Sequence, residues 1–109
     1  MQLLTAETLA LNGLRQWLAD RFASRVKELV LFGSRARGEG DEDSDLDVLV
    51  VVDDLDSGEA REIAHACGDL LTAHDVLVSP LALSTSRMKL LRDRERRIAA
   101  EIDREGIRL

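Results

Sequence analysis

The stretch Leu29–Val52, LVLFGSRARGEGDEDSDLDVLVVV, restricts the fold more than any other part of the chain. Two apolar runs flank a Gly-Ser turn and an acidic loop, and the second run opens with Asp45-Leu46-Asp47. Side chains alternate between the faces of a strand, so Asp45 and Asp47 point the same way, about 7 Å apart. Two carboxylates this close repel each other unless a positive charge lies between them.

A pair of Mg²⁺ ions, typically ~3.5–4 Å apart, would fill this gap and bind an oxygen-rich ligand such as a triphosphate. Gly33-Ser34 directly follows the first apolar run, and backbone N–H groups at the beginning of a helical turn suit a phosphate. The alternative is structural: Asp45 and Asp47 cap a strand or face water.

The stretch resembles the active-site motif of the DNA polymerase beta-like nucleotidyltransferase superfamily, in which Gly-Ser precedes Asp-x-Asp at this spacing. Here Arg35 to Ser44 separate Gly33-Ser34 from the Asp pair. The similarity is greatest to the minimal nucleotidyltransferases, small prokaryotic domains often paired with a HEPN-domain protein as antitoxin and toxin. It covers most of the chain, including the closing residues 105–109.

The resemblance implies that Asp45 and Asp47 bind two Mg²⁺ ions. A third carboxylate is expected from a neighbouring strand, and Asp75 is the candidate because it opens the apolar segment HDVLVS. In the family this residue helps to hold the catalytic metal and steers or deprotonates the attacking hydroxyl. The alternative for Asp75 is a loop residue without a metal role.

The same resemblance assigns the nucleotide to the turn. Ser34, with Gly33 and the N–H groups around it, would hold the β- and γ-phosphates. Arg35 and Arg37 could add charge-assisted hydrogen bonds to the triphosphate, the alternative being that both are surface residues.

Two other motifs fail. A calcium-binding EF-hand numbered from Asp41 requires Gly at Leu46 and Glu at Val52. Gly33 and Gly38 have P-loop spacing, but the position of the required lysine is Glu39.

The length of 109 residues predicts a single nucleotidyltransferase domain over residues 1–109. Net charge of −6 and only 3% aromatic residues argue against a general nucleic-acid surface. No apolar run approaches the ~20 residues of a membrane span, and the start lacks the pattern of a signal peptide. The single cysteine, Cys67, fits a reducing compartment, so a cytoplasmic location is expected.

The expected fold class is α/β, and the resemblance implies a small mixed β-sheet with helices mainly on one face. Periodicity and capping residues predict the elements in order. They are a helix over 5–22 with Thr5 as its N-cap, a strand over 26–32, a turn and short helix over 33–38, a strand over 45–52, a helix from Asp56 to about Ala73, a strand over 75–79 stopped by Pro80, a helix from about 84–86 to 105, and a short strand over 107–109.

His74 and the arginines between positions 87 and 97 each have a structural and a functional interpretation. His74 beside Asp75 is a candidate base, although an exposed or structural histidine is the commoner case. His65 is expected to be exposed and Cys67 to lie in the core. The arginines between positions 87 and 97 form either a solvated helix face or a contact surface for a partner.

The leading functional hypothesis is an enzyme that moves a nucleoside monophosphate, AMP in the first instance, from ATP or another NTP to a hydroxyl of a HEPN-domain partner. Because the chain contains no tyrosine, any modified tyrosine belongs to another protein. A second hypothesis is a non-catalytic antitoxin that masks its partner. A third is a transferase for a small molecule, such as an aminoglycoside, that needs a second subunit. The sequence leaves the oligomeric state open.

Overall fold

The computed structural model describes residues 3–39, 45–94 and 96–109. The acidic loop over 40–44 lies outside these residues, as does Glu95, which interrupts the apolar positions of the helix expected up to residue 105. The elements in chain order are α1 (Thr5–Phe22), the 3-10 turn η1 (Ala23–Arg25), β1 (Val26–Phe32), β2 (Leu46–Val52), α2 (Ser57–His74), β3 (Val78–Ser84), α3 (Thr85–Asp93), α4 (Arg97–Glu105) and β4 (Ile107–Arg108).

The four strands form one sheet in the order β3-β2-β1-β4. β1 runs antiparallel to both β2 and β4, whereas β2 runs parallel to β3, with α2 as the crossover between them. The sheet is therefore mixed, as predicted. The bounds expected for β1 and the end expected for α1 are confirmed, and the short closing strand is present as β4. The expected N-cap of α1 is wrong, because Thr5 is already helical and Leu4 is the N-cap, with its N–H bound by the Glu7 side chain.

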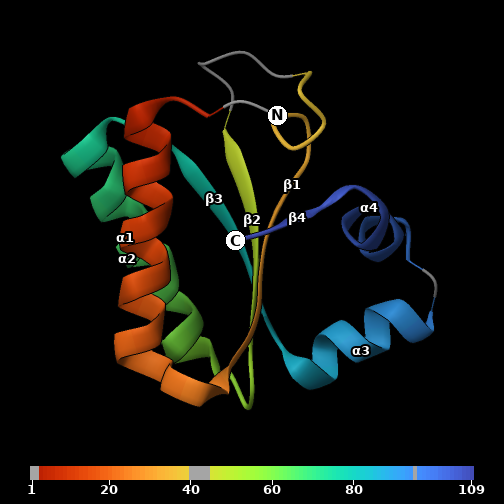
Figure 1. Cartoon of the computed structure of the whole chain (residues 1–109). Helices are drawn as coiled ribbons and strands as arrows, with labels where there is room; N and C mark the ends of the chain where they lie inside the picture. The colour runs from red at the N-terminus through yellow and green to blue at the C-terminus, as the bar shows by residue number, and fades with distance from the viewer. Residues whose placement is uncertain (1–2, 40–44, 95) are drawn as a thin grey trace.

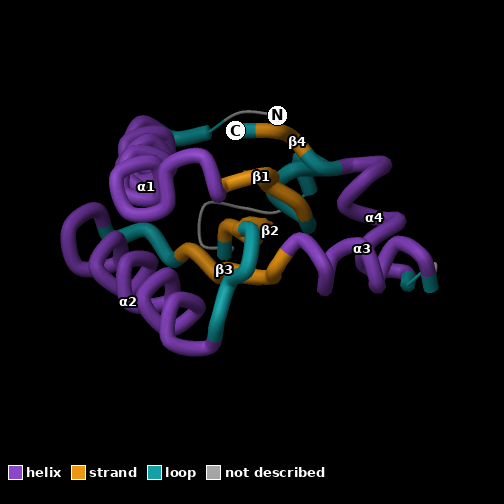
Figure 2. Tube along the Cα trace, turned by 90° about the horizontal axis from the view of Figure 1, so that it is seen from below, coloured by secondary structure: helices purple, strands orange, loops and turns teal. Residues whose placement is uncertain are grey.

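Helices cover both faces of this sheet (Figures 1 and 2). The long helices α1 and α2 lie together on one face, which agrees with the expectation of helices mainly on one side. The short helices α3 and α4 cover the other face and enclose a second, smaller core with residues such as Val30, Met88 and Ile102.

β2 is the central strand, and its apolar residues divide between the two cores. Leu46, Val48, Val50 and Val52 pack toward α1 and α2, whereas Leu49 and Val51 pack toward α3 and α4. Because side chains alternate, Asp47 belongs to the same face as Leu49 and Val51. The α3–α4 side of the sheet is thus the side that receives this carboxylate.

The predicted strand over 75–79 is wrong, because β3 begins at Val78 and continues through Pro80 to Ser84. Pro80 lies opposite Val48 of β2. β3 lies at an edge of the sheet, next to β2, and a proline on an edge strand loses no ladder hydrogen bond when its nitrogen faces the open side. Pro80 therefore marks an edge strand and does not end it.

The prediction of a single helix up to residue 105 is also wrong, because α3 ends at Asp93 and a separate helix, α4, begins at Arg97. Arg96 is extended, with φ −64° and ψ 139°, and serves as the N-cap of α4. The two helices fold against each other, and Arg92 of α3 binds Asp103 of α4 at 2.8 Å and Glu28 of β1 at 2.8 Å. Arg92 thus joins both helices to the sheet.

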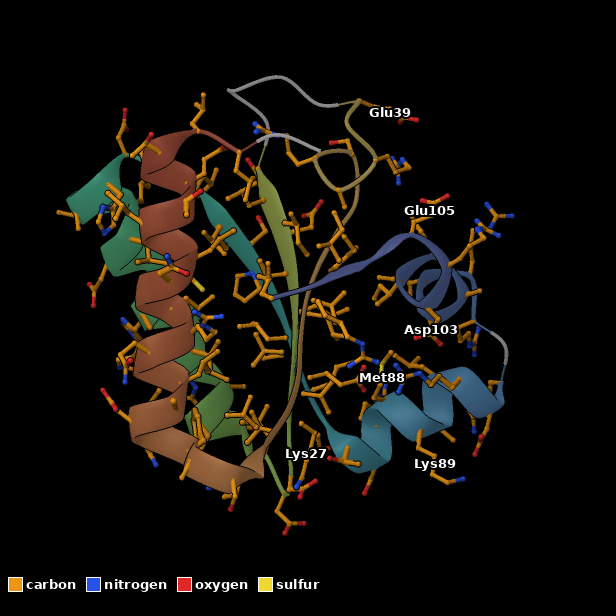
Figure 3. The ribbon with its side chains drawn as sticks, in the orientation of Figure 1. Lys27, Glu39, Met88, Lys89, Asp103 and Glu105 are labelled. Atoms are coloured by element: carbon orange, nitrogen blue, oxygen red, sulfur yellow. The ribbon has the colours of Figure 1, made fainter. Side chains whose placement is uncertain are left out.

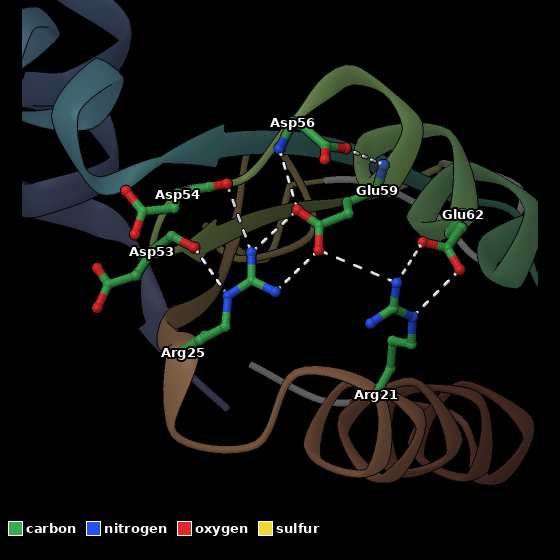
Figure 4. A network of polar contacts seen from close by, with 7 residues as sticks. All are labelled: Arg21, Arg25, Asp53, Asp54, Asp56, Glu59 and Glu62. Atoms are coloured by element: carbon green, nitrogen blue, oxygen red, sulfur yellow. Dashed lines mark hydrogen bonds and ion pairs between the residues drawn. The ribbon is translucent and has the colours of Figure 1, made fainter.

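An ion-pair network attaches α2 to the segment between α1 and β1 (Figure 4). Arg25 donates to both Glu59 oxygens, at 2.8 and 2.9 Å, and to the carbonyl oxygen of Asp53 at 3.0 Å. Arg21 donates to Glu62 at 2.9 and 3.1 Å. None of the helices in the described ranges has the length and apolarity required to cross a lipid bilayer.

Candidate functional site

The two carboxylates of the Asp-x-Asp motif lie at the beginning of the central strand. Asp45 immediately precedes β2 and is exposed, whereas Asp47 is half-buried, opposite Phe32 of β1 and Ser79 of β3. Burial raises the pKa of the Asp47 carboxyl, and the negative charges of Asp45 and Glu101 raise it further, while Arg37 acts in the opposite direction. Asp47 therefore lies in a region with excess negative charge.

Gly33 brings the backbone of the turn against Asp47. It is buried, adopts φ +80°, and has no room for a side chain, because a Cβ here would overlap Oδ2 of Asp47. Gly33 is followed by a hydrogen-bonded turn rather than the predicted short helix: the Arg37 N–H donates to Gly33 O at 3.2 Å and the Glu39 N–H to Ser34 O at 2.9 Å. Ser34 is half-buried within this turn.

Ser79 is a site residue that the sequence analysis missed. It is paired with Asp47 in the parallel register, and its hydroxyl donates to Oδ2 of Asp45 at 3.1 Å. The sequence analysis missed Ser79 because it expected the strand to end before Pro80. That shorter strand did not indicate which residue would lie opposite Asp47 on β2. The side chain beside the Asp pair on β3 is thus a hydroxyl and not a carboxylate.

Asp75 does not open a strand, as the sequence analysis expected, but ends the helix α2. It is the exposed C-cap of α2, with φ +56°, and its N–H donates to Leu71 O at 3.0 Å. Over residues 3–39, 45–94 and 96–109, no three side chains of His, Cys, Asp or Glu gather where they could hold a metal. The structure brings Asp45 and Asp47 together, and the role of Asp75 as third carboxylate stays a prediction.

Arg35 and Arg37 have different surroundings despite their spacing. The Arg35 side chain is only 6% exposed and binds the equally buried Glu7 of α1 at 2.7 Å. Glu7 also accepts the N–H of Leu4 at 2.8 Å, which ties the start of α1 to the turn. Arg37 is 30% exposed and is surrounded by the carboxylates of Glu39, Glu101 and Glu105.

The remaining candidates have simpler positions. Cys67 lies in the core, as predicted, and burial raises the pKa of its thiol to about 11, so it is protonated at neutral pH. His65 is exposed, as predicted, and His74 is half-buried at the end of α2.

The residues present at the Asp pair fit a divalent cation. Carboxylate oxygens are hard ligands of the kind that Mg²⁺ prefers. The raised pKa of Asp47 has the like charge of Asp45 among its causes, and a cation between the two would remove that repulsion. Asp45 and Asp47 are the residues that would hold the metal.

The sequence model of the family described as "Nucleotidyltransferase domain" matches residues 11–104, a range that includes the Asp pair, the Gly-Ser turn and α4 up to its last residue but one. "Putative protein adenylyltransferase MJ0604" of Methanocaldococcus jannaschii is 35% identical over 68 residues, which are 62% of this chain and 63% of that protein. The aligned part is thus less than two thirds of this relative.

Two solved structures have the same fold. One is a crystal structure of "the toxin-antitoxin with AMP-PNP", with a TM-score of 0.62 and 23% identity over 96% of this chain and 72% of that chain. The other is a mutant of the toxin-antitoxin MntA-HpeT, with a TM-score of 0.56 and 22% identity over 91% of this chain and 70% of that chain. At these identities the likeness establishes the fold.

Proposed function

Because the chain belongs to the nucleotidyltransferase domain family, we propose that it transfers AMP from Mg-ATP to a hydroxyl group of a partner protein. The observation that carries this proposal is the close approach of Gly33 to Asp47, with Asp45 beside it. A backbone turn without a side chain and two carboxylates on a buried strand together provide a place for phosphate and metal.

The site residues divide into three proposed roles. Asp45 and Asp47 hold the metal, and the turn at Gly33 and Ser34 binds phosphate through its N–H groups and hydroxyl. Arg37 supplies a positive charge to the triphosphate. Arg35, whose guanidinium binds Glu7, contributes by fixing the turn on α1 rather than by reaching the nucleotide. Asp75 stays the proposed third carboxylate, to be tested separately because of its position at the C-cap of α2.

The proposed reaction is an in-line displacement at the α-phosphorus. The acceptor oxygen forms a bond to phosphorus, the bond to the bridging oxygen of pyrophosphate breaks, and the hydroxyl proton passes to solvent. Two bound Mg²⁺ ions would neutralise phosphate charge and lower the pKa of the attacking hydroxyl. The chain contributes by aligning the triphosphate along the turn, so that attack and departure lie in line.

The acceptor is proposed to be a HEPN-domain protein, which the transfer inactivates as a toxin in the cytoplasm. Three observations support this. One relative is named as a protein adenylyltransferase, solved structures with this fold come from toxin-antitoxin pairs, and the chain has no tyrosine of its own.

The test is label transfer to the product of the neighbouring reading frame. ATP labelled at the α-phosphate should label that protein in the presence of Mg²⁺, and its intact mass should rise by one AMP. ATP labelled at the γ-phosphate should transfer nothing, which separates nucleotidyl transfer from phosphorylation. Asp47→Asn protein should give no adduct, and an adduct of equal yield would contradict the proposal.

Masking of the partner without transfer is the alternative, favoured by the net charge of −6, which complements a basic RNase surface. Protein carrying Asp45→Asn and Asp47→Asn separates the two. Loss of protection from the toxin supports transfer, and full protection supports masking.

A further inference from the structure

Arg37 is held by carboxylates from two parts of the chain. Its Nη1 donates to Oε1 of Glu101 at 2.6 Å and to Oε2 of Glu105 at 3.4 Å, both on α4. Its Nε donates to Oε2 of Glu39 on the turn at 3.1 Å. Within the part of the chain that the structure describes, Nη2 makes no hydrogen bond. One end of the guanidinium is therefore fixed by α4.

The core holds α4 in place to make these contacts. Ala99 and Ile102 are buried against the sheet, and Gly106 lies so close to it that a Cβ would overlap Ile102 O and Val30. Glu101 and Glu105 are four residues apart and share one side of the helix. The side chain of Asp103 points instead toward α3, where it binds Arg92 (Figure 3). Glu105 binds Arg37, as Glu39 of the turn does. Two carboxylates of α4 thus bind Arg37, and a third binds Arg92 of α3.

Arg37 also lies close to the Asp pair. Asp47 faces the α3–α4 side of the sheet, and its Oδ2 lies against Gly33, whose carbonyl oxygen accepts the N–H of Arg37 at 3.2 Å. The arginine is thus held next to the proposed metal and phosphate site, although α4 is outside the motif that identified this site.

From this geometry we infer that Glu101 and Glu105 are positioning residues for the nucleotide: they hold the Nη1 end of Arg37 so that its Nε–Nη2 edge meets the triphosphate. The inference rests on the function proposed above. Among the described residues, Nη2 has no hydrogen-bond partner and Nε donates to Glu39, which lies two residues away and has a side chain that is 66% exposed. A phosphate can displace such a local surface pair at little cost, and the planar edge then provides two donors for phosphate oxygens.

The test is a double-mutant cycle on Mg-ATP binding. Glu101→Gln with Glu105→Gln should weaken binding about fivefold in the wild-type background, as expected for a partly exposed ion pair. In the Arg37→Ala background the same two changes should have almost no effect, because the residue they orient is missing. Asp103→Asn is the matched control, since it removes a carboxylate of the same helix that binds Arg92, and affinity should not change. Thermal melts verify that each variant is folded.

Each outcome has a defined meaning. In the transfer assay the glutamate changes should raise KM for Mg-ATP and leave kcat nearly unchanged. Tighter binding would overturn the inference, because the glutamates would then compete with phosphate. Unchanged binding would also overturn it, while transfer by the wild-type protein would still support the proposed function. Weakened binding without any transfer would uphold the inference and reject that function. No nucleotide binding by the wild-type protein would reject both.

Discussion

At the residue scale, Gly33 and Gly38 form a natural comparison. Both have positive φ, +80° and +76°, but a Cβ meets Asp47 at Gly33 and meets nothing within 4 Å at Gly38. Alanine at either position should cost about 1 kcal/mol of stability from backbone strain. Gly33→Ala alone should also abolish Mg-ATP binding, because the new methyl group displaces the carboxylate. Calorimetric titration of both variants checks this, and equal losses of affinity would contradict it.

Asp47 should lower the stability of the ligand-free protein when it is ionised. Its folded pKa lies above the ordinary value of 3.8, so the folded state binds the proton more tightly than the unfolded state does. Stability contributed by the protonated form is lost as pH rises from 3.8 through the folded pKa. The Asp47→Asn variant lacks this loss, so its melting temperature should exceed that of wild type, by more at neutral pH than near pH 4. If the difference in melting temperature between Asp47→Asn and wild type became smaller as pH rises, this would contradict the raised pKa of Asp47.

Arg35 should matter for folding more than for phosphate. Its ion pair with Glu7 is buried, and truncation would leave the Glu7 charge without its guanidinium. Arg35→Ala should therefore lower the free energy of unfolding by about 3–5 kcal/mol. Arg35→Met together with Glu7→Leu should recover most of this loss. Urea denaturation measures both, and a loss below about 1 kcal/mol in the single variant would show that the pair contributes little.

Sequence reasoning reached some of these residues and missed others for physical reasons. The order of Gly33 and Asp47 along two apolar runs is a local pattern, and the antiparallel pairing of β1 with β2 then brings them together. The pairing of Arg35 with Glu7, 28 residues apart, depends on how α1 packs on the turn, which no spacing records. The contact of Arg37 with Glu101 of α4, 64 residues apart, is equally hidden.

At the element scale, the network in Figure 4 makes the attachment of α2 depend on pH. The hydrogen bonds from Arg25 lower the pKa of Glu59 to about 2, with help from the Asp56 N–H. The stabilisation that the ionised Glu59 carboxylate provides is complete above its ordinary pKa of 4.5 and is lost as pH falls toward 2. The wild-type protein should therefore have a higher melting temperature than Glu59→Gln at neutral pH. This difference in melting temperature should disappear as pH falls from 4.5 toward 2. A gap independent of pH would contradict the role of the charge.

Elements with an uninterrupted pattern were predictable, and those decided by their neighbours were not. The apolar spacing of α1 predicted its end at Phe22, and the apolar run of β1 predicted both bounds of that strand. β3 was misplaced because proline stops a central strand but is tolerated on an edge, and edge status is a property of the sheet. The break between α3 and α4 was missed because Met88, Ala99 and Ile102 also fit one face of a continuous helix.

At the scale of the whole molecule, ligand binding should stabilise the fold. A ligand bound only by the folded state raises its stability, by about 2.7 kcal/mol at a concentration one hundred times Kd. Mg-ATP should therefore raise the melting temperature, more than ATP with a chelator does. In Asp47→Asn protein this increase should be much smaller. An equal increase in the variant would count against binding of the metal by Asp47.

Metal and triphosphate should share one location, at the Asp pair beside the Gly33 turn. A crystal structure of the protein soaked with Mg²⁺ and a non-hydrolysable ATP analogue tests this most directly. The predicted result is metal density bound by Asp45 and Asp47, with the triphosphate lying along Gly33 and Ser34. Density for the nucleotide elsewhere, with the two carboxylates directed away from any metal, would contradict the account.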